Sequence, residues 1–393
     1  MASIGPVSTE VCCDIFRELR SQSVQENVCY SPLLIISTLS MVYIGAKDNT
    51  KAQIEKVRLH LRFKPSCCLT YIFICIHVNQ CGTSVSIHTS LKDIFTRITK
   101  PSSNYSISIA RRLYAEEKYP ILPEYIQCVK ELYKGGLESI SFQTAAEKSR
   151  ELINSWVESQ TNGTIKNILQ PSSVSSQTDM ILVSAIYFKG LWEKAFKEED
   201  TQTIPFKISE QESKPVQMMS QIGTFKVAEI PSEKCKILEL PYASGRLSLW
   251  VLLPDDISGL EQLETAITFE NLKEWTSSSK MEERKIKVYL PRMKIEEKYN
   301  LTSVLKSLGI TDLFSSSANL SGISSAESLK VSGAFHEAFV EIYEAGSKES
   351  GSSEAGVDDS SVSEEIRADH PFLFLIKHNP SDSILFFGRC FSP

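Results

Sequence analysis

The most constraining feature of this chain is an abrupt change of composition near its C-terminus. Residues 341–365 (EIYEAGSKESGSSEAGVDDSSVSEE) are polar and charged, and two apolar runs follow at 368–376 (ADHPFLFLI) and 384–389 (ILFFGR). The polar segment holds too few large apolar side chains to bury itself, so we expect residues 341–365 to form a long exposed loop. The two apolar runs are split by NPSD at 379–382, which predicts a hairpin of buried strands.

Length and patterning favour one large domain of mixed architecture. A chain of 393 residues with 42% hydrophobic residues can bury a large core, and by length alone it could form two domains. Its serine-rich stretches are too short to separate independent cores. Helical and strand patterns alternate without the regular rhythm of a parallel α/β fold, which favours an α+β domain over residues 1–393. The net charge of −6 argues against a nucleic-acid partner.

The segment 27–46 (NVCYSPLLIISTLSMVYIGA) carries no charge and bears on targeting. Polar residues and a proline interrupt the run, so a buried helix is favoured over a membrane span, and we expect no stable membrane association. Ser31-Pro32 is typical of a helix start, with proline in the first turn. The N-terminus shows no basic region followed by an apolar core and a cleavage site, so no standard signal peptide is predicted.

Several further segments match one known family in order along the chain. Residues 180–188 are apolar on both faces, as expected of a central strand in a large sheet. Together with the C-terminal runs, the segments 27–46, 179–196, 250–254 (WVLLP), 288–293 (VYLPRM) and 310–314 (ITDLF) resemble the serpin family. The resemblance implies three β-sheets, eight or nine helices, and residues 341–365 as an exposed reactive-centre loop. Stretches such as 150–161 (RELINSWVESQT) are similar to the egg-white members of that family.

One block departs from the family pattern. Residues 62–80 (RFKPSCCLTYIFICIHVNQ) hold three cysteines and an uncharged run where relatives have a polar segment. The β-branched and aromatic content suits a strand, but no pairing partner is evident, and we assign this atypical segment no function.

A search for catalytic motifs finds none. His336-Glu337 begins like H-E-x-x-H, but Val340 stands where the second histidine is needed. No nucleophile elbow, phosphate loop or dinucleotide fingerprint occurs, and the ten cysteines fit no metal template. We therefore expect no catalytic residue, no cofactor and no metal site, and the protein is predicted not to be an enzyme. The serpin resemblance implies that His336 forms hydrogen bonds between strands where the sheet opens.

Two functional classes remain within the resemblance: a protease inhibitor and a non-inhibitory storage protein. An inhibitory serpin is cleaved in its loop and inserts the front of that loop as a new central strand, which requires small, uncharged hinge residues. Here the hinge reads Gly346, Ser347, Lys348 and Glu349, and strand side chains alternate between faces. One register would bury Glu349 and Asp359, and the other would bury Lys348, Glu354 and Asp358.

Insertion in either register would bury a charged side chain, which costs several kcal/mol when the charge has no partner. We therefore expect a non-inhibitory egg-white storage protein. Counting along the resemblance places the nominal scissile bond at Ser360-Ser361, a poor bait without a basic or aromatic residue. The alternative is a serine protease inhibitor with this bait bond, and Ser347 is compatible with it. If the chain is not an inhibitor, we expect serine proteases to bind it only as a substrate.

The resemblance also implies covalent features. It places a disulfide at Cys81 and Cys128, a phosphate on Ser352, and export of a monomer through an uncleaved internal signal in residues 27–46. Four N-x-S/T sequons occur, at Asn104, Asn162, Asn300 and Asn319. Of these, Asn300 matches a glycosylated position of the family and ranks first, and Asn319 ranks second.

Overall fold

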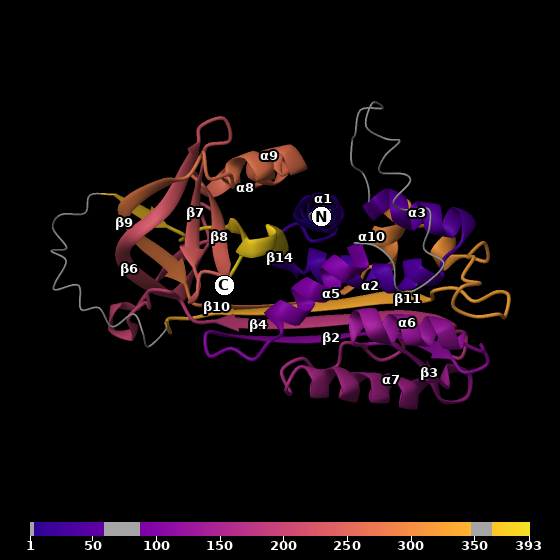
Figure 1. Ribbon diagram of the computed structural model, residues 1–393. Helices are drawn as coiled ribbons and strands as arrows, with labels where there is room; N and C mark the ends of the chain where they lie inside the picture. Colours follow the sequence, from indigo (N-terminus) through magenta and orange to yellow (C-terminus); the bar gives the residue numbers. More distant parts are fainter. Residues whose placement is uncertain (1–3, 59–86, 347–363) are drawn as a thin grey trace, which may run out of the picture.

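The structure is a computed structural model, and it describes residues 4–58, 87–346 and 364–393. Over these ranges helices and strands form the mixed α+β fold that was predicted, and the described α-helices are in line with the expected eight or nine (Figure 1). They are α1 (Ile4–Gln22), α2 (Pro32–Gly45), α3 (Asp48–Arg58), α5 (Ile87–Ile98), α6 (Pro123–Tyr133), α7 (Phe142–Gln160), α8 (Leu260–Ala266), α9 (Phe269–Trp275) and α10 (Thr302–Ser307).

A five-stranded sheet runs across the middle of the molecule (Figure 1). Its order is β10-β11-β4-β2-β3, so β4 is central, as the apolar pattern at 180–188 predicted. β4 pairs in parallel with β11 and antiparallel with β2. The strands are β2 (Tyr105–Glu116), β3 (Leu137–Ile140), β4 (Met180–Gly190), β10 (Met293–Asn300) and β11 (Gly333–Ile342).

Both faces of this sheet are covered. Alternate side chains of β4 enter two separate hydrophobic cores, with Leu182 and Ile186 in the larger and Val183 and Ala185 in the smaller. Helix α7 covers the face that bears the smaller core, and α2 packs on the other (Figure 1). A strand added to this sheet would therefore be buried on both sides.

The remaining strands form one continuous nine-stranded sheet. The long strand β6 joins its two parts, because it pairs with β7 over Lys226–Ile230 and with β9 over Met218–Val227. These two parts and the five-stranded sheet account for the three sheets implied by the resemblance. The strands are β1 (Val28–Tyr30), β5 (Gln202–Lys207), β6 (Ser213–Ile230), β7 (Cys235–Pro241), β8 (Leu247–Pro254), β9 (Glu282–Pro291), β12 (Glu365–Arg367), β13 (Phe372–His378) and β14 (Ser383–Cys390).

The C-terminal hairpin is confirmed. β13 and β14 pair antiparallel, and every residue of both strands is buried. The turn between them ends at Asp382, whose φ of 53° lies in the left-handed region that aspartate tolerates.

The uncharged segment 27–46 forms the buried helix α2, preceded by the short strand β1. The Ser31 hydroxyl accepts a hydrogen bond from the Leu34 N–H at 3.2 Å and caps the helix, and Pro32 occupies its first position. Since α2 is apolar on nearly all sides, it lies in the core rather than at a surface. Within the described ranges no helix is both long and apolar enough to span a membrane.

The predicted boundaries of the exposed loop are wrong at both ends. Ile342 ends β11 and is buried, and Glu344 is only 3% exposed. At the other end Glu365 begins β12, which pairs in parallel with β9. Composition marked these residues as polar, but it could not reveal the partners that hold them. The rest of the predicted loop, residues 347–363, and the atypical segment 62–80 lie outside the described residues.

Candidate functional site at the base of the polar segment

The chain leaving β11 is anchored to the turn that follows β4. The indole Nε1–H of Trp192 donates to the Tyr343 carbonyl at 2.6 Å, and the Trp192 N–H donates to the Ala345 carbonyl at 3.0 Å. Trp192 itself is buried, and it stacks on Tyr242 with ring centroids 4.5 Å apart. The indole therefore fixes the position from which residues beyond Gly346 depart.

Glu344 is the charged centre of this anchor. Arg292 Nε donates to both carboxylate oxygens, at 3.0 and 3.1 Å, and the Thr201 hydroxyl donates to Oε1 at 2.8 Å. Burial alone would raise the pKa of Glu344, but the hydrogen bonds from Arg292 and Thr201 outweigh it and hold the pKa below its ordinary value. The carboxylate thus stays ionised although it is nearly buried.

Gly346, the first of the four predicted hinge residues, is tightly confined. A Cβ at this position would lie 2.6 Å from the Ala195 Cβ and 2.7 Å from the Ala195 backbone nitrogen. Only glycine fits at this position, because the Ala195 backbone atoms and the Cβ fixed to them cannot move aside. The other hinge residues, Ser347, Lys348 and Glu349, lie outside the described residues.

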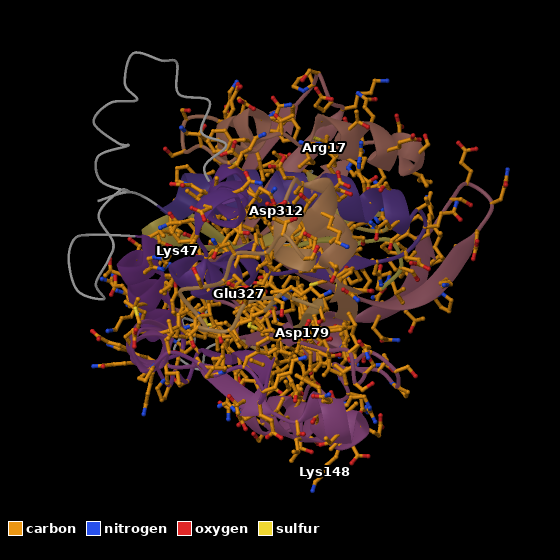
Figure 2. The ribbon with its side chains drawn as sticks, turned by 90° about the vertical axis from the view of Figure 1, so that its right-hand side faces the viewer. Arg17, Lys47, Lys148, Asp179, Asp312 and Glu327 are labelled. Atoms are coloured by element: carbon orange, nitrogen blue, oxygen red, sulfur yellow. The ribbon has the colours of Figure 1, made fainter. Side chains whose placement is uncertain are left out.

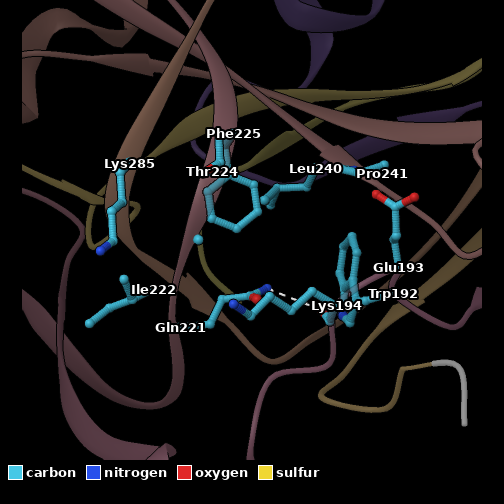
Figure 3. A pocket seen from close by; sticks show the side chains of 11 residues that line it. Trp192, Glu193, Lys194, Gln221, Ile222, Thr224, Phe225, Leu240, Pro241 and Lys285 are labelled. Atoms are coloured by element: carbon cyan, nitrogen blue, oxygen red, sulfur yellow. Dashed lines mark hydrogen bonds between the residues drawn. The ribbon is translucent and has the colours of Figure 1, made fainter. Parts of the chain in front are cut away.

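A cavity of about 620 Å³ borders the same anchor. Trp192, Lys194, Gln221 and Lys285 line it, and Gln221 donates to the Lys194 carbonyl at 3.3 Å (Figure 3). Through this contact the turn after β4 touches β6, so the base of the polar segment is tied to both sheets.

Deeper in the five-stranded sheet, His336 links β11 to β4 and to the start of α2. Its Nε2 accepts from the Ser31 N–H at 3.0 Å, so Nδ1 carries the proton and donates to the Ser184 hydroxyl at 2.9 Å. Burial lowers the pKa of His336 to about 3, so the ring is neutral. This contact between strands agrees with the role that the sequence resemblance implied for His336.

The neighbouring residue on the opposite face, Glu337, is less well satisfied. It is fully buried, and its nearest cation is Lys298 Nζ at 3.4 Å on β10, which contributes no hydrogen bond. Burial raises the pKa of Glu337 to about 8; the charge of Lys298 opposes the shift and Glu296 adds to it. The glutamate is therefore protonated at neutral pH.

The cysteines of the described ranges divide into two groups. Cys128, buried on α6, is disulfide-bonded, whereas Cys81 lies outside the described residues, so their pairing stays a prediction. The free thiols of Cys12, Cys13, Cys29, Cys235 and Cys390 are all buried. Burial raises the pKa of each of them, which makes them poor nucleophiles.

The structure describes only some of the other predicted site residues. Ser352, Ser360 and Ser361 lie outside the described residues. Asn300 is exposed at the end of β10, where its Oδ1 accepts from the Thr302 hydroxyl at 2.6 Å. Asn319 is half-buried. Among the residues that the structure describes, no group of three histidine, cysteine or acidic side chains could hold a metal ion.

Sequence reasoning missed the anchor of Glu344. Arg292 lies 52 positions before Glu344, and Trp192 lies 151 positions before Tyr343. The one local signal was an arginine and a glutamate at the borders of predicted strands, which does not specify a pair. The anchor combines a buried carboxylate paired with a half-exposed arginine and a confined glycine, at the end of a strand that neighbours β4.

A five-stranded sheet in which parallel β4 and β11 are neighbours, with the chain anchored where it leaves β11, is the arrangement of a serpin. The family model described as serpin (serine protease inhibitor) matches residues 6–393, and the chain belongs to this family. It is 68% identical to ovalbumin of Dromaius novaehollandiae, with all of both chains covered.

Two solved structures extend the comparison, and each match covers all of both chains. Uncleaved ovalbumin superposes with a TM-score of 0.91 at 65% identity. A loop-inserted structure of a cleaved ovalbumin mutant superposes with a TM-score of 0.86 at 61% identity. These relatives confirm the predicted resemblance to serpins and the prediction that the protein is not an enzyme.

Proposed function

We propose that this protein is a secreted, non-inhibitory serpin that serves as a storage protein of egg white. Its likeness to ovalbumins over its whole length supports the class. The observation that carries the non-inhibitory assignment is the conflict between the charged hinge sequence and the covered sheet it would have to enter.

The conflict lies at the boundary between β4 and β11. These strands pair directly over Ile181–Lys189 and Gly333–Glu341, so an inserted segment would have to separate them. The side chains on both faces there are buried in the two cores. Glu349 in one register, or Lys348 in the other, would lose its hydration without a prepared partner, at a cost of several kcal/mol. Gly351 adds about 0.5–1 kcal/mol in either register.

The alternative is an inhibitor that acts by insertion after cleavage at Ser360-Ser361. Two observations favour it: Ser347 is small and uncharged, and a cleaved ovalbumin mutant has been solved with its loop inserted. A fold of this kind can therefore accept the strand when the sequence allows it.

A panel of serine proteases separates the two functions. We expect an elastase-like enzyme to cut near Ser360-Ser361 and leave with full activity, so a denaturing gel should show cleaved chain and no covalent complex. An inhibitory serpin treated in parallel serves as the positive control. A protease-linked band that resists denaturation, with loss of protease activity, would establish the inhibitory alternative instead.

The proposal includes an export route through residues 27–46 without cleavage, a Cys81–Cys128 bridge, a glycan on Asn300 and phosphate on Ser352. Export must precede folding, because α2 lies in the core of the folded chain. Mass mapping of the secreted protein without reduction should find an N-terminus at Met1 or Ala2 and a cross-linked peptide joining Cys81 to Cys128. A mature chain starting beyond residue 46 contradicts the export route, and free thiols at both cysteines contradict the bridge.

A further inference from the structure

The turn that follows α7 carries the sequon Asn162-Gly163-Thr164 on an exposed edge. Asn162 and Gly163 have φ values of 52° and 77°, a region that these two residue types adopt readily. Backbone bonds close the turn, since the Gly163 N–H donates to the Glu158 carbonyl at 2.8 Å and the Thr164 N–H to the Thr161 carbonyl at 3.0 Å. The turn therefore does not depend on the Asn162 side chain.

The amide of Asn162 can accept a substituent without losing its contact. Its Nδ2 donates to the Ser108 hydroxyl on β2 at 3.1 Å. An asparagine amide has two N–H groups, and N-linked glycosylation replaces one of them. The remaining N–H can keep the bond to Ser108, so the folded chain has no reason to reject a sugar here.

The surroundings of Asn162 also suit a carbohydrate. A cavity of about 350 Å³ borders Asn162; β2, α5, the end of α6 and α7 line it, and the lining includes Ser108, Arg112, Trp156 and Gln160. The Arg112 guanidinium lies 4.1 Å from the centroid of the half-buried Trp156 ring. The guanidinium covers one face of the ring, so a sugar would contact the remaining surface of the indole and place its hydroxyls on the polar donors beside it.

The outer surface of α7 leaves room for a larger glycan. Figure 2 shows α7 at one edge of the molecule, with Lys148 pointing away from it. Glycans belong on exposed turns of secreted chains, because they are bulky and hydrated.

Asn319, which the sequence ranked second, is half-buried, whereas Asn162 is exposed. Its Nδ2 donates to the Asp48 carboxylate at 2.6 Å, its Oδ1 accepts from the Ser321 N–H at 3.2 Å, and its backbone N–H donates to the Thr50 hydroxyl at 2.9 Å. Asn104 is half-buried as well. In both sequons the hydroxyl residue is serine, whereas Asn162 and Asn300 precede threonine, whose β-branch restricts the hydroxyl to fewer rotamers.

We propose that Asn162 carries an N-linked glycan, ahead of Asn319, and that its first sugar lies against Trp156 in the cavity beside β2. The inference rests on the proposed secretion, because the glycan is added in the secretory pathway.

The test uses the full chain secreted from vertebrate cells. Peptide-N-glycosidase in heavy-oxygen water labels each formerly glycosylated asparagine as aspartate, and peptide mass spectrometry then reads all four sequons. We expect label at Asn162 and Asn300 in most molecules. Asn162→Gln and Thr164→Ala should each remove one glycan from the secreted protein, Thr164→Ser should retain it, and Asn319→Gln should leave the mass of the glycans unchanged.

The outcomes separate this inference from the proposed function. A secreted chain with an empty Asn162 overturns the inference and leaves the proposed secretion intact, whereas a chain that does not reach the medium overturns both. For the cavity, Trp156→Ala should speed release of the Asn162 glycan from the native protein several-fold, while release from Asn300 stays unchanged and reports an intact fold. Equal release rates at Asn162 in both proteins would refute the contact with Trp156.

Discussion

At the scale of single residues, Glu344 determines how the polar segment is attached. Its side chain is 5% exposed, whereas the side chain of Arg292 is 45% exposed. The pair thus combines a desolvated anion with a cation that water still reaches. Removing the cation leaves a buried charge, whereas removing the anion leaves a solvated one. The two halves of the pair should therefore differ in their effect on stability.

We predict that Arg292→Gln lowers the free energy of unfolding by about 1–3 kcal/mol, because solvent screens part of the interaction. Glu344→Gln should have a smaller effect, since a neutral amide can still accept from Thr201 and needs no counter-ion. Arg367→Gln, which breaks the exposed pair with Glu365, is the control and should change stability by less than about 1 kcal/mol. Chemical denaturation measures all three. Equal effects for Arg292→Gln and Arg367→Gln would contradict the role of burial.

At the scale of elements, the pairing of β10 with β11 contains a built-in response to pH. Lys298 lies opposite Glu337 in the register of the two strands, yet it does not keep the buried carboxyl ionised at pH 7. Between the ordinary pKa of 4.5 and the folded value of about 8, the folded chain holds a proton that the unfolded chain releases. The stability that comes from protonating Glu337 is thus complete below pH 4.5, and it is lost as the pH rises through 8.

Replacing this carboxyl with an amide should remove that dependence. Glu337→Gln is expected to match the unmodified protein near pH 4.5 and to be more stable by on the order of 4–5 kcal/mol at pH 9. Glu274→Gln removes an exposed carboxylate that pairs with Lys280, away from these two strands, and serves as the control, with little change at either pH. Thermal denaturation across this range measures the difference. A variant that is less stable than the parent at pH 9 would show that Lys298 stabilises an ionised Glu337.

The elements that the sequence predicted are those with a local cause. The apolar run of β4, the Ser31-Pro32 start of α2 and the turn between β13 and β14 each follow from neighbouring residues. The parallel pairing of β4 with β11, the Arg292–Glu344 ion pair and the depth of Glu344 depend on residues far apart in the chain. Local composition could not show them, and so it placed the start of the exposed loop several residues too early.

At the scale of the whole molecule, adding a strand between β4 and β11 would disturb both cores and the contacts that join these strands. β4 and β11 must separate, the His336 bonds to Ser184 and Ser31 must yield, and every inserted side chain must enter one of two cores. For small uncharged residues the new backbone hydrogen bonds and buried surface would outweigh these losses. In this chain the charges of Lys348 and Glu349 would be desolvated first, and that cost offsets the gain from the new hydrogen bonds and buried surface.

We therefore predict that cleavage near Ser360-Ser361 raises the melting temperature of the unmodified protein little. Replacing Lys348 and Glu349 together with alanine removes the first charge from both registers, so the cleaved double variant should insert further and melt at least about 10 °C higher than its intact form. That rise corresponds to several kcal/mol in a domain of this size. Asp358→Ala with Asp359→Ala removes the last charges instead and is the matched control. Because insertion proceeds from the hinge, these later charges act only after the first obstacle has been passed, and the control should rise much less. If the unmodified protein already melts far higher once cut, desolvation of the hinge charges does not limit insertion, and the non-inhibitory behaviour must arise from the bait bond.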